Sequence, residues 1–159
     1  MAEQEQLAQA KATFETLCKA LDNHKLRYQK HEETLSVECG IQGDDLPMEF
    51  DIRVDAKRML IMVLSKLPAK IKEEKRLDVA VAVSAINNML ADGCFDYDVA
   101  SGNMFFRMTN SFLGSTIGEE VFAYLLFFAC EVIDAYNDKF LMLSTGMLSL
   151  EQFLQSLAN

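Results

Sequence analysis

The sequence predicts an α+β fold, in which an antiparallel sheet of about five strands has helices packed on it. Three observations lead to this prediction. Apolar residues recur at helical spacing near the start of the chain, they alternate with charged residues over 48–55, and capped apolar helices are expected near the end. The chain has 159 residues, 50% of them apolar, which is enough for one buried core. We therefore expect residues 1–159 to form a single domain.

The first element expected is a helix over residues 3–23, because its apolar residues fall on one stripe. The residues of this stripe are Leu7, Ala10, Phe14, Leu17 and Leu21. The stripe is short and has no clear charge pattern beside it, so packing on the domain's own sheet is favoured over a coiled coil. Residues 24–31 are basic, but Glu32 and Glu33 follow at once, which favours a solvated connector over an RNA-binding patch.

Three strands are expected next, and the first of them covers residues 34–41. The strongest strand pattern is the strict alternation of apolar and charged residues over 48–55, which indicates one buried and one wet face. After a short turn, a third strand is expected over 58–67. Because residues 59–64 of this segment are all apolar, we expect it to lie centrally and to be buried on both faces.

A second helix is expected between Pro68 and Gly93. It should start near Glu73, because acidic residues favour a helix N-terminus, and Gly93 is a typical C-terminal stop. The alternation of residues 79–83 also permits a strand at this position.

The last part of the chain predicts a hairpin followed by two helices. Residues 95–98 and 104–109 form the hairpin, because turn residues separate them. A capping box over 116–119 predicts the start of a long apolar helix that runs to about Asn137. A second capping box, over 149–152, predicts a short C-terminal helix.

The charge balance argues against nucleic acid and membranes as partners. Lys and Arg total 15 and Asp and Glu total 24, and the formal net charge of -9 repels phosphate backbones and anionic lipids. The N-terminal segment does not resemble a secretory signal, and the longest apolar run, 121–130, is about half of what a bilayer requires. The four cysteines form no CxxC pair, so we expect free thiols and a cytoplasmic protein.

No residue pattern indicates a catalytic, cofactor-binding or metal site. Asp96 and Asp98 share one side of a strand, but nothing converges on them, so we expect a polar outer face rather than acid–base chemistry. His24 and His31 lack a Cys or His partner at the spacing that a nucleophile or a metal centre requires. The glycines are not grouped between a strand and a helix, which argues against a phosphate-binding loop.

Short motifs follow one another in a moderately specific order over roughly residues 48–157. They are Leu67-Pro68, Glu73-Glu74-Lys75-Arg76, Ile86-Asn87, Gly93-Cys94-Phe95-Asp96-Tyr97-Asp98, Gly102, Phe106-Arg107, Tyr136, Gly146 and Ser149-Leu150-Glu151. In this order they resemble the YbjN family, which is similar in fold to the secretion chaperones of type III systems. The resemblance implies a small adaptor or chaperone-like domain, often dimeric, with no active site to carry over. One departure is Asn137, where the family often has a proline, which puts the local helix break in doubt.

We therefore expect a homodimeric protein-binding module, not an enzyme, with a regulatory role in bacterial sensory transduction. The second helix is apolar on nearly all sides, so one side should meet the sheet and another a second subunit. By analogy with the fold, Val79, Val83 and Ile86 are the candidates for the dimer contact. The alternative is a small-molecule-binding sensory regulator, in which Phe105 and Phe128 line an aromatic pocket.

Overall fold

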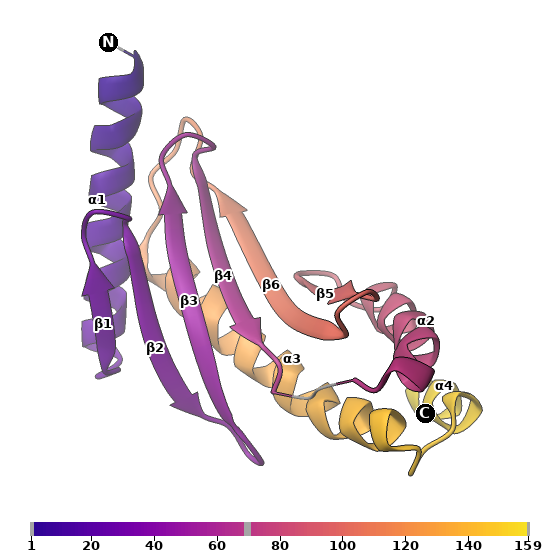
Figure 1. Ribbon diagram of the computed structural model, residues 1–159. Helices are drawn as coiled ribbons and strands as arrows, with labels where there is room; N and C mark the ends of the chain where they lie inside the picture. Colours follow the sequence, from indigo (N-terminus) through magenta and orange to yellow (C-terminus); the bar gives the residue numbers. More distant parts are fainter. Residues whose placement is uncertain (1, 69–70, 159) are drawn as a thin grey trace.

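The computed structural model describes residues 2–68 and 71–158, which form a six-stranded sheet and four α-helices (Figure 1). The strands are β1 (Tyr28–His31), β2 (Ser36–Gln42), β3 (Pro47–Asp55), β4 (Leu60–Lys66), β5 (Cys94–Asp98) and β6 (Asn103–Ser111). The helices are α1 (Ala2–Asn23), α2 (Arg76–Asn87), α3 (Glu119–Thr145) and α4 (Leu150–Leu157), and a 3-10 turn, η1 (Glu73–Lys75), precedes α2. The predicted α+β class and antiparallel sheet are confirmed.

The strand order is β1-β2-β3-β4-β6-β5, and every neighbouring pair is antiparallel. The first four strands form a meander joined by short turns. The chain then passes through α2 before it enters β5, so that β5 becomes the outer strand and β6 lies between β5 and β4. The register places Ile52 opposite Val63 in the centre and Phe95 opposite Phe106 at the β5 end.

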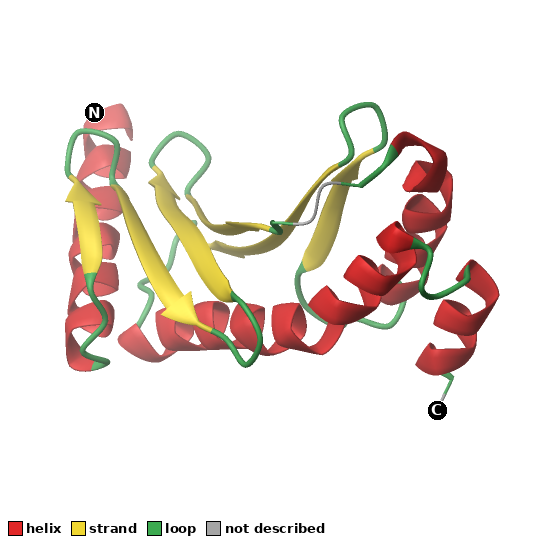
Figure 2. Ribbon diagram, turned by 60° about the horizontal axis from the view of Figure 1, so that its bottom comes forward, coloured by secondary structure: helices red, strands yellow, loops and turns green. Residues whose placement is uncertain are grey.

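The helices cover one face of this sheet (Figure 2). The long helix α3 runs along that face, α1 packs on β3 and α3, and α2 packs on β5, α3 and α4. Every second residue of each strand points toward the helices. These strand residues and the apolar sides of the helices form one core. The largest fully buried side chains in it include Phe95, Phe106, Phe112, Phe140 and Phe153. None of the described helices has the combination of length and apolarity that a membrane crossing requires.

The stripe expected on the first helix packs within the domain. Ala10, Phe14, Leu17 and Leu21 are buried, whereas Leu7, nearer the N-terminus, is 45% exposed. The Gln9 side chain also donates hydrogen bonds to two backbone carbonyls of the loop before α3, at 2.9 and 2.7 Å. The preference for packing on the domain's own elements over a coiled coil is consistent with these contacts.

The sheet has one strand more than expected, because residues 28–31 form β1 instead of a solvated connector. They pair antiparallel with β2, with Tyr28 opposite Cys39 and His31 opposite Ser36. The turn between β1 and β2 contains no Gly, Pro, Asn or Asp. Leu35 instead adopts a left-handed backbone, with φ 49°, and buries its side chain. Leucine rarely takes this conformation, so the sequence carries no recognisable turn signal there.

The helix boundaries differ from expectation at three places: the end of α2, the start of α3 and the end of α3. Residues 79–83 are helical, as the sequence favoured, but α2 ends at Asn87, before Gly93, which forms the turn into β5 with φ 69°. The predicted capping box over 116–119 is wrong, because α3 has Gly118 as its N-cap and no side chain caps it.

At the C-terminal end of α3, the structure shows the effect of having Asn137 where the YbjN family often has a proline. The helix continues past Asn137 to Thr145 and ends at Gly146, whose φ of 79° is left-handed. Since no proline follows Tyr136, nothing breaks the helix at that point. The second predicted capping box is confirmed, because the Ser149 hydroxyl and the Gln152 side chain each accept the other residue's backbone N–H.

Candidate functional site

The candidate site is the face of the sheet without helices among the described residues, which we call the open face. The strand residues that point away from the core form it, and those used below are Gln29, Glu38, Gly40, Glu49, Asp51, Arg53, Leu60, Met62, Leu64, Lys66, Cys94, Asp96, Phe105 and Arg107. Figure 1 shows the sheet from this side, with α3 behind it.

An apolar strip runs along the middle of the open face. Leu60, Met62 and Leu64 of β4 form it, and Phe105 of β6 extends it next to Lys66. All four side chains are half-buried, whereas the residues of β4 that point to the helices, such as Ile61, are fully buried. The expectation that β4 is buried on both faces is therefore wrong: the strand is apolar on both faces, but the chain's own helices cover only one of them.

Charged residues flank the apolar strip on both sides. On one side, the Arg53 guanidinium bonds to Asp51, with Nε to oxygen distances of 3.0 and 2.9 Å. On the other side, Arg107 Nε donates to Asp96 at 2.6 Å, and this guanidinium holds the pKa of Asp96 below its usual value. The Glu49 side chain forms no hydrogen bond or ion pair with another described residue. An apolar centre with a polar rim is the usual anatomy of a protein–protein interface.

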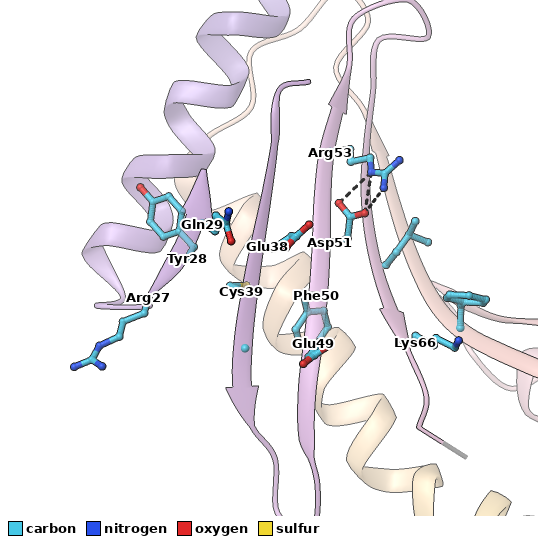
Figure 3. A pocket seen from close by; sticks show the side chains of 13 residues that line it. Arg27, Tyr28, Gln29, Glu38, Cys39, Glu49, Phe50, Asp51, Arg53 and Lys66 are labelled. Atoms are coloured by element: carbon cyan, nitrogen blue, oxygen red, sulfur yellow. Dashed lines mark hydrogen bonds and ion pairs between the residues drawn. The ribbon is translucent and has the colours of Figure 1, made fainter. Parts of the chain in front are cut away.

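A hollow of about 780 Å³ lies on the open face around Gly40 (Figure 3). Gly40 has no side chain, so bare backbone of β2 is accessible there, directly opposite Glu49 of β3. A Cβ atom at Gly40 would meet only the Met48 carbonyl oxygen, at 3.9 Å. The other open-face residues that border the hollow are Gln29, Glu38, Asp51, Arg53, Leu64, Lys66 and Phe105. The hollow is wide enough for a large side chain of a partner, and its border carries both signs of charge.

The two aspartates considered for acid–base chemistry have separate roles. Asp96 pairs with Arg107, whereas Asp98 accepts hydrogen bonds from the Ala100 N–H at 3.0 Å and the Ser101 hydroxyl at 2.5 Å in the turn after β5. Within the described residues, no three His, Cys, Asp or Glu side chains come together as a metal site would require.

The four cysteines are free. Burial raises the pKa of Cys39 to about 11 and that of Cys130 to about 12. A thiol acts as a nucleophile only when it is deprotonated, so these two are unsuited to that role near neutral pH.

The residues proposed from sequence for a dimer contact lie inside the protomer. Val79 and Ile86 are completely buried and Val83 is 7% exposed, because this side of α2 packs against β5 and α3. These side chains therefore contribute to the protomer's own core. The outward residues of α2 are Leu77 and Val81, which are 74% and 47% exposed.

The two phenylalanines proposed to line a pocket lie on different sides of the sheet. Phe105 borders the hollow on the open face. Phe128 belongs to α3, which covers the other face, and its ring stacks on that of Tyr124 with 5.4 Å between centroids. The pair therefore does not form one aromatic pocket. Sequence reasoning missed Gly40 and Leu64, although the apolar character of both faces of β4 was a signal for the strip.

Comparison with known proteins finds similarity in fold but none in sequence families. No protein-family model and no curated protein sequence matches it. Solved structures do match, and they define a class: the chain has the fold of type III secretion chaperones and of YbjN.

Three structures show this likeness. The crystal structure of YbjN from E. coli matches with a TM-score of 0.58 and 16% identity, over 79% of this chain and 91% of that one. A chain of the ExsC-ExsE complex matches with a TM-score of 0.57 and 12% identity, over 79% and 90%. A chain of the HopA1-SchA chaperone–effector complex matches with a TM-score of 0.52 and 11% identity, over 77% and 91%. The fold expected from the short motifs is thereby confirmed.

Proposed function

We propose that this protein is a non-enzymatic, chaperone- or adaptor-like module that binds a segment of another protein across its open face. The observation that carries the proposal is the strip of Leu60, Met62, Leu64 and Phe105. The three residues from β4 make this central strand apolar on the side that no described helix covers, and Phe105 of the neighbouring strand β6 extends the apolar surface. Burying such a surface against a partner is favourable by about 25 cal/mol for each Å² removed from water.

The open face is a better candidate for partner binding than the edges of the sheet. At one edge, β1 is only 4 residues long and carries the charged Lys30, and both features disfavour pairing with a further strand. At the other edge, α2 packs on β5. The face, in contrast, combines an apolar strip, a polar rim and a hollow.

The fold likeness supports a protein partner in a general way. Two of the matching chains come from structures of complexes, and one of these is a chaperone with its effector. At identities of 11–12% this kinship concerns the fold, so the client of the present chain has to be found by experiment. A cytoplasmic location and a regulatory role in sensory transduction are further parts of the proposal, and the four free cysteines fit the former.

The test is affinity capture from a lysate of the source organism, with matched variants. Replacing Leu64 and Phe105 together by Ser removes the middle of the strip, and Leu141→Ser on α3 is the control, since Leu141 is 45% exposed but lies on a helix. We expect wild type and the control to capture the same partner in near-stoichiometric amount, and the double variant to lose it while its circular dichroism stays unchanged. Equal capture by all three proteins would refute binding through the open face.

We also propose that the protein is a homodimer through the outward side of α2. Leu77 and Val81 are one helical turn apart and exposed, next to the small residues Ala80 and Ser84, so two copies of this side can interlock. Light scattering should show a dimer for wild type and a monomer for Leu77→Asp, whereas Met147→Asp, at a site that is also 74% exposed, should remain dimeric. A monomeric wild type would refute the dimer but not the open-face site.

A further inference from the structure

Asn87, the last residue of α2, is bonded by its side chain to the backbone of β5. Its Nδ2 donates to the Phe95 carbonyl oxygen at 2.9 Å, and its Oδ1 accepts the Phe95 N–H at 2.8 Å. Both bonds have good length and both are partly buried. One side-chain amide therefore satisfies both backbone groups of one strand residue.

These two backbone groups lie on the free edge of the sheet. β5 is an outer strand, paired only with β6. In an antiparallel pair, successive residues direct their N–H and C=O groups alternately toward and away from the partner strand. Since Phe95 gives both groups to Asn87, they point away from β6, and the next residue with this orientation is Tyr97. A carboxamide offers one N–H donor and one C=O acceptor side by side, as a peptide group does. Asn87 thus occupies the place of one peptide group of a further strand.

Other contacts hold Asn87 in this position. One turn earlier on α2, Val83 is buried, and Ile86 next to Asn87 is buried completely. At the other end of α2, the Arg76 guanidinium binds the Ala100 and Ser101 carbonyls in the turn between β5 and β6. Both ends of α2 are therefore tied to the hairpin that they cover.

The turn between α2 and β5 also requires Gly93. Its φ is 69°, and a Cβ atom there would lie 2.5 Å from Met108 Sδ and 2.6 Å from the Phe106 ring. The chain can therefore reverse tightly enough for Asn87 and Phe95, eight residues apart, to face each other.

We infer that Asn87 closes the β5 edge against pairing with the same edge of a second copy of this chain. An unpaired outer strand offers free N–H and C=O groups to any strand that approaches, and a second copy of this chain carries the same edge. Two β5 edges can pair antiparallel about a twofold axis, so the contact would be self-complementary. The inference does not depend on the open-face site or on the α2 dimer.

The test compares Asn87→Ala with Asn88→Ala. Asn88 is the neighbouring residue, it is exposed, and no hydrogen bond of its side chain to a described residue is present. Hydrogen exchange should be about tenfold faster at the Phe95 amide in Asn87→Ala, as expected for the loss of one hydrogen bond, and unchanged in Asn88→Ala. With rising concentration, Asn87→Ala should reach at least twice the mass of wild type by light scattering, with growing protection of the Tyr97 amide. Asn88→Ala should keep the wild-type mass.

Either of two results would overturn the inference. The first is a Phe95 amide that stays as protected in Asn87→Ala as in wild type. The second is faster exchange of the Phe95 amide in Asn87→Ala with no increase in mass over wild type at any concentration. Asn87 would then only cap the backbone of Phe95 and would not prevent pairing of two β5 edges. If Asn87→Ala does not fold, Asn87→Ser can be used instead, because water beside the smaller side chain can bond the backbone of Phe95. The same changes in exchange and mass are expected for this variant. Because the added mass is measured relative to wild type, the result is separate from the α2 dimer.

Discussion

Replacing Gly40 by Thr should stabilise the protein while it places a side chain in the hollow on the open face. Gly40 lies inside β2, where a glycine costs stability because it loses more backbone freedom on folding than other residues and packs no side chain. Its backbone is not left-handed, and an added Cβ would make only an ordinary contact, 3.9 Å from the Met48 carbonyl oxygen. Threonine is also among the residues that strands favour.

The size of the effect follows from these contacts. Removing a strand glycine gains about 0.5–1 kcal/mol, and the added Cβ meets no close neighbour that would oppose this gain. Gly43, three residues further on, gives the opposite expectation. A Cβ there would lie 2.5 Å from Asp134 Oδ1 and 2.8 Å from the Leu46 carbonyl oxygen, which belongs to the backbone and cannot easily move. Gly43→Ala should therefore cost about 1–3 kcal/mol.

Thermal unfolding followed by circular dichroism measures both changes. For a chain of this size, 1 kcal/mol corresponds to about 2–4 °C in Tm, so Gly40→Thr should raise the midpoint slightly and Gly43→Ala should lower it clearly. In the capture experiment, Gly40→Thr should lose the partner despite its higher stability. If Gly40→Thr were as unstable as Gly43→Ala, the face around Gly40 would be covered rather than open, and the reasoning about the site would fail.

Three further predictions concern single groups. Arg107 lowers the pKa of Asp96 in the folded state. The pair's contribution to the free energy of unfolding should therefore be complete above the unfolded pKa of about 3.8 and disappear as the pH falls below it. When the free energy of unfolding is measured at decreasing pH, Arg107→Gln should lose less stability than wild type in that range. Cys39 and Cys130, with pKa values of about 11 and about 12, should react with a thiol reagent at pH 8 only after unfolding, and rapid labelling of the native protein would contradict this. Ser149→Ala should cost about 1 kcal/mol in urea unfolding because it removes the confirmed cap of α4, and an unchanged midpoint would show that the cap contributes nothing.

The strands and helices that follow a simple period could be predicted from sequence. The alternation over 48–55 identified β3, and the second capping box identified α4, because each pattern records a local requirement of the backbone. β1 could not be found this way. Its turn depends on a left-handed Leu35, which is tolerated because burial of that side chain compensates for the strain.

The site was harder to predict than the fold, because it depends on which surfaces the chain leaves uncovered. The apolar residues of β4 indicated burial on both faces, and only the arrangement of the helices shows that one face lacks a cover. The same holds for α2. Its composition indicated two apolar sides, but Val79 and Ile86 could be distinguished from Leu77 only once the helix was placed against β5.

Because one layer of helices covers the sheet, the order of synthesis matters for this chain. α1 is complete at residue 23, yet α3, against which it packs, begins only at residue 119. At about 5–20 residues per second, a ribosome needs roughly 5–20 s to add the intervening segment of about 100 residues. Until α3 is made, the apolar stripe of α1 and the inner side of the β1–β4 meander lack the part of their native cover that α3 supplies. A nascent chain that stalls before α3 should therefore aggregate or be retained by general folding factors, although most of its sheet has already been made.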